Sequence, residues 1–229
     1  DTWMEPAPGC RMEDLKVAEY PGMHRYTATQ GWPPLLDALV ERVRQRQGIP
    51  TERADILITG GATLGLGVVV AAITNPGDEV LITAPYWPLI AGIVRAFHAV
   101  PIAVPFHGAA DSPESAVEIL RAHTTERTVA VYWNTPHNPS GRVVPRAWLE
   151  AMCAWAEREN LWIVADEVYE ECQFDGQPTF TRALAPERTF SCHSFSKAYG
   201  MAGNRCGYVV GPQASIRELG KVSLHAFYS

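Results

Sequence analysis

The chain has 229 residues, of which 47% are hydrophobic and 19% are charged, and its formal net charge is −6. This length allows a sizeable core, and the composition is typical of a soluble globular protein. The negative charge argues against a nucleic-acid or membrane-surface partner, and no apolar stretch is long enough to span a bilayer. The five cysteines show no paired spacing, so we expect free thiols and a cytoplasmic protein.

The amino-terminal part differs in pattern from the rest of the chain. Residues 1–30 are rich in turn formers, so we expect mostly loop. A helix then opens at Pro33 and Pro34, where proline is tolerated, and ends at Gly48. Short apolar runs follow, and they predict strands at 55–59, 79–84, 100–106, 128–134, 161–165, 188–195 and 206–211. Helical patterns lie between most of them, after residue 61 and at 85–99, 112–124, 145–160 and 213–227.

This alternation predicts the fold class. Short apolar strands that alternate with helices are typical of a mostly parallel sheet with helices on both faces, a three-layer α/β/α fold. No internal repeat or linker is visible, so we expect one continuous domain over residues 1–229. In such folds ligands bind at the carboxyl ends of the strands. The residues that follow each strand are therefore the candidates for a site.

Small residues follow the first strand in a form that suits an anion, and an aromatic residue follows the second. Gly61, Ala62 and Thr63 come between a strand and a helix, where bare backbone N–H groups and the helix dipole favour negative charge. A tight turn without a ligand is an equally good interpretation. Trp87 follows the strand at 79–84 and either stacks on a planar ligand or packs in the core.

Polar residues end the central strands. Asn138 lies in a turn stiffened by two prolines and a glycine, "NTPHNPSG", which is costly scaffolding for a plain loop. Asp166 directly follows the apolar run at 161–165, and burying its carboxylate requires a partner. A protonated pyridine nitrogen is one suitable partner, and a helix-capping role is the alternative.

The stretch "SFSKAYGMAGNRCG" at 194–207 combines a lysine, hydroxyls, glycines and an arginine. A neutral amine on Lys197 can attack a carbonyl and form a Schiff base. Ser194 and Arg205 suit a phosphate. An amine beside a phosphate-binding group is what a pyridoxal 5′-phosphate (PLP) enzyme needs, although an isolated lysine of this kind is more often a solvated loop residue.

Taken together, these motifs resemble a known family. The fold-type I PLP-dependent aminotransferases of class I/II, the aspartate aminotransferase superfamily, are similar over nearly the whole chain. The motifs that carry the resemblance are, in chain order, "GGAT", "PYW", "NTPHNPSG", "DEVY" and "SFSKAYGMAGNRCG".

The resemblance implies a role for each residue around the cofactor ring. Lys197 would hold PLP as a Schiff base and act as the catalytic acid and base. Asp166 would pair with the pyridine nitrogen, and Asn138 and Tyr169 would bind the ring's 3′ oxygen. Trp87 would stack on the ring. Asp166 and Tyr169 are thereby expected to act in catalysis with Lys197.

The resemblance also implies a phosphate site and a partner subunit. Gly61, Ala62 and Thr63 would bind the phosphate together with Ser194 and Arg205. No metal ion is expected.

Tyr26, in "RYTATQG", resembles the tyrosine that reaches the phosphate of the neighbouring subunit, so the resemblance implies a homodimer with shared sites. The family's small carboxy-terminal domain, which carries the arginine for the substrate carboxylate, is absent from this chain. We therefore expect residues 1–229 to be the PLP-binding large domain, incomplete at both ends.

The implied activity is ping-pong transfer of an amino group between an L-amino acid and a 2-oxo acid. The same scaffold also supports lyases that break a carbon–sulfur bond and synthases that close rings, because fold alone does not decide the reaction. A PLP-binding regulatory domain is a third interpretation. The sequence favours an enzyme over a regulator because the full set of implied catalytic residues is present.

Overall fold

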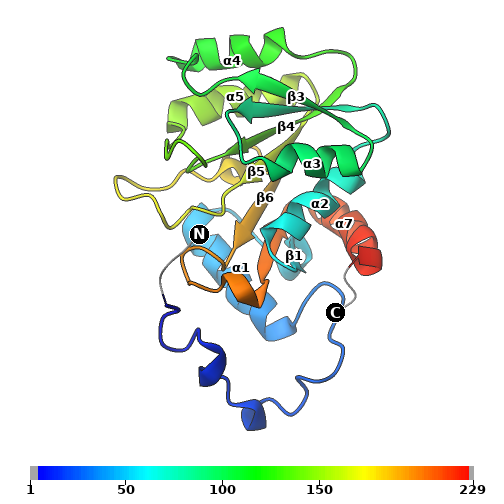
Figure 1. Cartoon of the computed structure of the whole chain (residues 1–229), viewed down its shortest axis with the longest axis vertical. Coiled ribbons are helices and arrows are strands. Elements are labelled where there is room, and N and C mark those ends of the chain that lie inside the picture. Colours follow the sequence, from blue (N-terminus) through cyan, green and yellow to red (C-terminus); the bar gives the residue numbers. More distant parts are fainter. Residues whose placement is uncertain (1–4, 227–229) are drawn as a thin grey trace.

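The computed structural model describes residues 5–226 and has a central sheet covered by helices (Figure 1). The seven strands are β1 Ile56–Thr59, β2 Glu79–Ala84, β3 Val100–Pro105, β4 Thr128–Asn134, β5 Trp162–Asp166, β6 Thr189–Ser194 and β7 Gly207–Val210. The α-helices are α1 Pro33–Gln47, α2 Ala62–Ile73, α3 Leu89–Ala96, α4 Pro113–Ala122, α5 Arg146–Arg158, α6 Thr181–Leu184 and α7 Gln213–Ala226. The segment before α1 is irregular apart from two short 3₁₀ turns, as the sequence predicted, and it extends away from the sheet.

The sheet is mostly parallel, and its strand order is β1-β7-β6-β5-β4-β2-β3. Strands β3, β2, β4, β5 and β6 run parallel to one another. Strand β7 runs antiparallel to both β1 and β6. The parallel strands bring their carboxyl ends to one edge, where Asn134 of β4 lies opposite Asp166 of β5.

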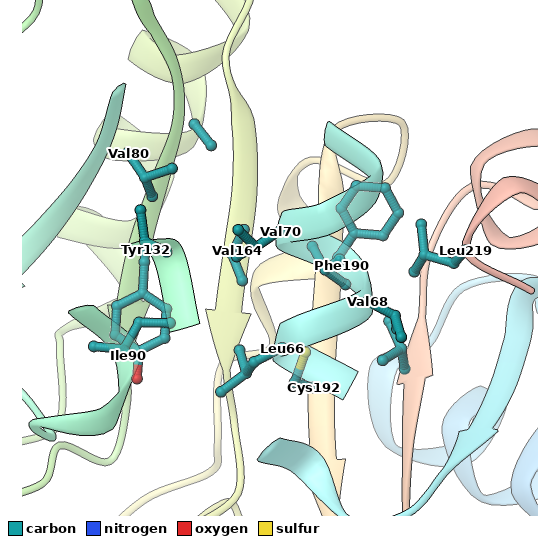
Figure 2. Close-up of a cluster of buried hydrophobic side chains, with 14 of the residues drawn as sticks. Leu66, Val68, Val70, Val80, Ile90, Tyr132, Val164, Phe190, Cys192 and Leu219 are labelled. Carbon is teal, nitrogen blue, oxygen red and sulfur yellow. The ribbon is translucent and has the colours of Figure 1, made fainter. Parts of the chain in front are cut away.

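Helices cover both faces, which confirms the predicted three-layer architecture. Helices α2, α3 and α7 bury one face through residues such as Leu66, Ile90 and Leu219 (Figure 2). Helices α4 and α5 cover part of the other face, and α1 covers the rest of it at the far end of the sheet, against β1 and β7. Alternate residues of one strand serve opposite layers, so Tyr132 of β4 belongs to the first core cluster and Trp133 to the second.

Helix boundaries follow local chemistry, and one prediction was wrong. Helix α4 begins where predicted, because the Ser112 side chain accepts a hydrogen bond from the Ser115 amide at 3.1 Å. The predicted helix over 85–99 is shorter and begins only at Leu89. Pro88 disfavours helical backbone at the residue before it, so Trp87 stays in the turn that leaves β2. The end of the predicted helix over 213–227 lies outside the described residues.

Within residues 5–226, no helix is both long and apolar enough to cross a bilayer.

Candidate active site

A cavity of about 270 Å³ opens at the carboxyl ends of the central strands. The amino-terminal end of α2, the turn after β2 and the segments that follow β4, β5 and β6 enclose it. Nine of the eleven residues singled out from the sequence line it: Ala62, Thr63, Trp87, Asn138, Asp166, Tyr169, Ser194, Lys197 and Arg205. The fold thus brings together side chains that lie up to 143 residues apart in the chain.

The backbone at the start of α2 makes one wall of the cavity. Gly61 precedes the helix with a φ of 84°, and no side chain caps the first turn. The first-turn amides of a helix have no partner within that helix, so they remain available to an anion. A side chain at Gly61 would collide with the guanidinium of Arg205, and one at Gly207 would lie 2.7 Å from the Ala62 amide nitrogen. This close approach of bare backbone and arginine could hold a phosphate.

Asp166 ends β5 with its carboxylate buried against the cavity. Its side chain is 5% exposed. Oδ2 accepts a hydrogen bond from the Tyr132 hydroxyl at 2.7 Å, and Oδ1 accepts one from the Val168 amide at 3.4 Å. Burial raises the pKa of Asp166 to about 6, against the opposing effect of the Tyr132 hydrogen bond. Tyr132 was not among the residues predicted from the sequence, since it reads there as an ordinary core aromatic.

Asn138 and Tyr169 meet at the same wall. The Asn138 amide group donates to the Tyr169 hydroxyl at 3.4 Å. A second asparagine fixes this arrangement: Asn134 Oδ1 accepts from the Asn138 backbone amide at 2.6 Å, and its Nδ2 donates to the Asp166 carbonyl at 2.8 Å. Asn134 therefore connects Asn138 with Asp166. The only signal for it in the sequence was its place at the end of a strand.

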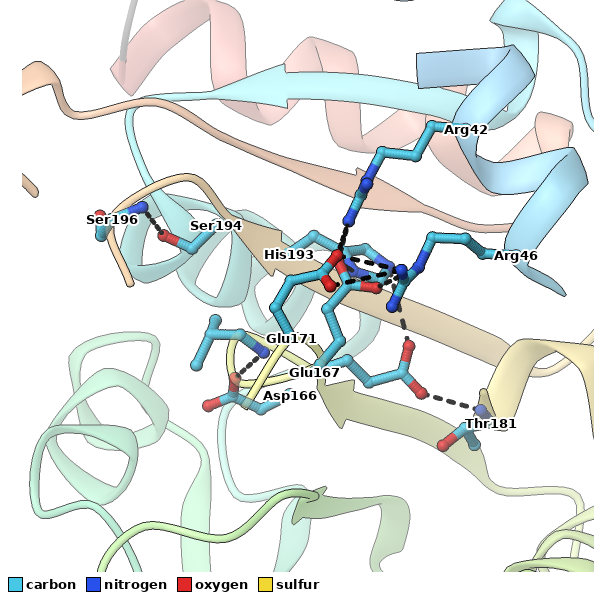
Figure 3. Close-up of polar contacts among 11 residues, drawn as sticks. Arg42, Arg46, Asp166, Glu167, Glu171, Thr181, His193, Ser194 and Ser196 are labelled. Atoms are coloured by element: carbon cyan, nitrogen blue, oxygen red, sulfur yellow. Dashed lines mark hydrogen bonds and ion pairs between the residues drawn. The ribbon is translucent and has the colours of Figure 1, made fainter. Parts of the chain in front are cut away.

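Lys197 follows β6 and faces Tyr169 across the cavity. Its Nζ lies 5.7 Å from the centre of the Tyr169 ring. Three residues before Lys197, the Ser194 hydroxyl accepts a hydrogen bond from the Ser196 amide at 3.0 Å, which turns the chain sharply before the lysine (Figure 3). Burial raises the pKa of Tyr169, with the Asp166 charge adding to the effect.

A histidine connects the two turns that carry Trp87 and Asn138. His137 Nε2 lies 2.7 Å from the Pro85 carbonyl oxygen, and its Nδ1 lies 2.6 Å from the Ser140 hydroxyl. The carbonyl can only accept, so Nε2 carries the proton and Nδ1 accepts from Ser140. His137 thereby joins the turn after β2 to the turn after β4.

A partly buried charge network links α1 and β6 to the segment after β5 (Figure 3). Arg42 of α1 pairs with Glu171, and Arg46 lies 3.4 Å from Glu170 Oε2. Glu170 also lies 3.1 Å from His193 Nδ1, which is buried in β6. Burial alone would raise the pKa of Glu170, but His193, Arg42 and Arg46 outweigh it and lower the pKa to about 2. The network ties the segment that carries Asp166 to α1 and β6.

Two predicted residues are not part of the cavity lining. Gly61 lies directly behind it, against Arg205. Tyr26 lies in the irregular amino-terminal segment and is 79% exposed. Among the described residues, no cluster of three or more His, Cys, Asp or Glu side chains could hold a metal ion.

Comparison with known proteins gives consistent matches. The sequence pattern of the family described as "Aminotransferase class I and II" matches residues 6–229. A probable aspartate/prephenate aminotransferase of Thermus aquaticus is 35% identical over 205 residues, which are 88% of this chain and 52% of the relative. An arginine–pyruvate transaminase of Pseudomonas aeruginosa is 34% identical over 209 residues, which are 90% of this chain and 53% of the relative.

The fold matches in the same way. The structure of Thermus thermophilus aspartate aminotransferase with maleate superposes with a TM-score of 0.91 at 31% identity, covering 100% of this chain and 59% of that one. The chain spans about half the length of the curated relatives it matches. The family pattern extends over nearly all of it, from the irregular amino-terminal segment to the last helix. The chain therefore belongs to the class I and II aminotransferase family.

Proposed function

We propose that this chain is the cofactor-binding large domain of a PLP-dependent aminotransferase. The enzyme would move an amino group between an L-amino acid and a 2-oxo acid in a ping-pong reaction. The observation that carries the proposal is the single cavity that gathers Lys197, Asp166, Asn138 and Arg205 at one edge of the sheet. Membership in the family adds support. When bound, PLP supplies an electron sink for the negative charge that develops at the amino acid's Cα.

The donor groups of the cavity suit each part of PLP. The buried Asp166 carboxylate is a partner for a protonated ring nitrogen, and Asn138 and Tyr169 offer donors to a phenolic oxygen. Trp87 offers an aromatic face to the ring.

The phosphate end is equally well matched. The amides at the start of α2, the Thr63 and Ser194 hydroxyls and the Arg205 guanidinium provide donors for a dianion. Gly61 lets the backbone approach it, since a larger residue there would meet the arginine.

Lys197 and Asp166 would carry the chemistry. The Lys197 amine would hold PLP covalently, and once an amino acid takes its place, its Nζ would take up the proton that leaves the amino acid's Cα. Asp166, when ionised, would be the partner that keeps the ring nitrogen protonated, an electrostatic contribution present before the reaction starts. Tyr169 and Asn138 hold the ring in the orientation that this proton transfer requires.

The expected assembly is a homodimer in the cytoplasm. Its amino-terminal segment exposes several large apolar side chains, among them Met12, Tyr20 and Trp32, which a partner subunit would cover. The described cysteines are all free, which fits a reducing compartment.

The first test is the visible absorption spectrum of the full-length protein with PLP, before and after addition of single amino acids. We expect a Schiff-base band that converts to the absorption of pyridoxamine phosphate with at least one amino acid. Relatives are named for aspartate, prephenate, arginine and pyruvate, so the panel includes acidic, basic and aromatic amino acids. Absence of any Schiff-base band would contradict the proposal.

Lys197→Ala separates the lysine from the rest of the site. We expect loss of the Schiff-base band and of turnover, because no other residue would supply the amine. Lys221→Ala is the matched control, since Lys221 is an exposed lysine of α7 paired with Glu218. An active Lys197→Ala protein would disprove the assigned role.

A lyase or ring-forming synthase is the alternative function for the same site. An amino acid with a good leaving group at its β carbon tells the two apart. A carbon–sulfur lyase releases ammonia and pyruvate without a 2-oxo acid acceptor, whereas an aminotransferase needs that acceptor to continue.

A further inference from the structure

Tyr132 places a hydroxyl group at the base of the candidate active site from within the hydrophobic core. It lies on β4, is 1% exposed, and packs in the apolar cluster with Ile90 and Leu66 (Figure 2). Its ring packs among aliphatic side chains, and its hydroxyl reaches Asp166 at the carboxyl end of β5. A buried hydroxyl is unfavourable unless it is hydrogen-bonded. Its partner here is the Asp166 carboxylate, at 2.7 Å.

The two carboxylate oxygens of Asp166 have different hydrogen-bond partners. Oδ2 accepts from Tyr132, whereas Oδ1 accepts only the longer bond from the Val168 amide at 3.4 Å. Asp166 is nearly fully buried, so the ionised form depends on donors and on nearby positive charge. A charge-assisted hydrogen bond from a neutral phenol is among the stronger contributions of this kind.

We propose that Tyr132 is a positioning residue: its hydroxyl holds Asp166 ionised and oriented, and thereby keeps the ring nitrogen of PLP protonated during the reaction. This inference rests on the proposed function. It assigns a task to a residue that contributes no surface to the cavity itself.

The other groups around Asp166 do not replace this donor. From β6, the buried Cys192 thiol and the His193 imidazole interact electrostatically with the carboxylate. From the segments after β5 and β6, Tyr169 and Lys197 do so. His193 and Lys197 favour the ionised carboxylate through their charge, but Glu167 and Glu170 already pair with His193. The Lys197 amine would be taken up in holding PLP, so its ammonium charge would not remain beside Asp166.

Tyr132→Phe is the direct test, made in the full-length protein. Without the hydroxyl the carboxylate is less stable, so the shared proton moves from the ring nitrogen toward Asp166. The readout is the ¹⁵N NMR signal of bound PLP labelled at the ring nitrogen, followed over pH. We expect the signal of the variant to shift toward that of a neutral pyridine, and turnover at neutral pH to fall about ten- to a hundredfold with little change in KM.

Trp133→Phe is the matched control from the next position of the same strand. Trp133 lies on the opposite face of the sheet, where its Nε1 donates to the Thr181 hydroxyl at 3.2 Å. This variant also removes one buried hydrogen bond from β4 but does not touch Asp166. We expect lower thermal stability and an unchanged ¹⁵N signal.

Two further measurements keep the inference falsifiable. Fluorotyrosine at position 132 retains the ring volume and makes the phenol a stronger donor, so the ¹⁵N signal should move in the opposite direction to that of Tyr132→Phe. A wild-type protein that binds PLP, with a Phe variant of identical ¹⁵N signal and pH profile, would overturn this inference alone. A wild-type protein that binds no PLP would overturn the proposed function as well.

Discussion

Asp166 is a single residue whose proposed function requires a buried charge, and that charge lowers the stability of the folded chain. A carboxylate at 5% exposure is held in the core by one strong hydrogen bond, and its pKa is raised to about 6 because burial disfavours its charge. Among residues 5–226, His193 and Lys197 favour its charge but do not outweigh the effect of burial. A protonated ring nitrogen would, which is consistent with a site prepared for a cationic partner.

Replacement of Asp166 by asparagine should therefore stabilise the cofactor-free protein. The folded pKa of about 6 lies above the ordinary value of 3.8, so the folded chain binds the extra proton and loses stability as pH rises through this window. The loss amounts to about 3 kcal/mol at neutral pH. We expect Asp166→Asn to raise the urea-unfolding midpoint at pH 7 and to match wild type near pH 4. An equal difference at both pH values would contradict the assigned burial cost. With PLP bound, the same variant should lose orders of magnitude in turnover.

Gly61 is the second residue whose identity is dictated by its surroundings. Its φ of 84° is rarely adopted by other residues, and a side chain there would meet Arg205. We expect Gly61→Ala to weaken PLP binding at least tenfold by displacing the arginine, measured by equilibrium titration of the absorption band. Gly77→Ala is the control, because Gly77 has a similar φ of 89° but open space around it. If the two variants weakened PLP binding equally, backbone strain and not the displacement of Arg205 would explain the loss.

At the scale of elements, the sequence predicted every strand and the long helices, because each is a short apolar run or an amphipathic stripe bounded by turn residues. It did not predict the strand order, the antiparallel direction of β7 or the late start of α3. These depend on pairing between distant segments and on a proline whose effect falls on its neighbour.

The same limit applies to the candidate site. Most of its polar cavity-facing residues could be predicted because strand ends in a parallel sheet meet at one edge, although Asn134 was missed. Its supporting contacts could not. Tyr132 and Asp166 are 34 residues apart, and Arg42 and Glu171 are 129 apart, so no local pattern connects them.

The charge network between α1 and the segment after β5 holds together the secondary-structure elements that carry the site. Glu170 has a pKa of about 2, below its ordinary value of 4.5, so it contributes stability above pH 4.5 that is lost as pH falls toward 2. We expect Glu170→Gln to lower the free energy of unfolding at pH 7 by about 3 kcal/mol, and the difference to shrink below pH 4.5. Glu218→Gln, which removes an exposed pair on α7, should leave the unfolding midpoint unchanged. A pH-independent effect of Glu170→Gln would point to packing instead of charge.

At the scale of the whole molecule, the irregular segment before α1 is the part that buries its large side chains least well within a single chain. It extends away from the sheet and exposes Tyr26 at 79%. Large apolar side chains on an extended segment are typical of a surface that a partner covers. In the proposed homodimer, Tyr26 of each subunit would complete the phosphate site of the other.

Shared sites predict complementation between two defective variants. Lys197→Ala removes the amine, and Tyr26→Phe removes a hydrogen bond to a charged phosphate, which should weaken PLP binding about tenfold or more. In a mixed dimer one site would carry both defects, and the other would combine an intact Lys197 with an intact Tyr26. We expect subunits mixed by mild denaturation and refolding to regain tight PLP binding in half of the sites of each mixed dimer, measured by titration at limiting PLP. Tyr26→Phe dimers and Lys197→Ala dimers refolded separately are the controls. If Tyr26 acted within its own chain, no mixed dimer would contain an intact site, and recovery would not exceed the sum of the controls.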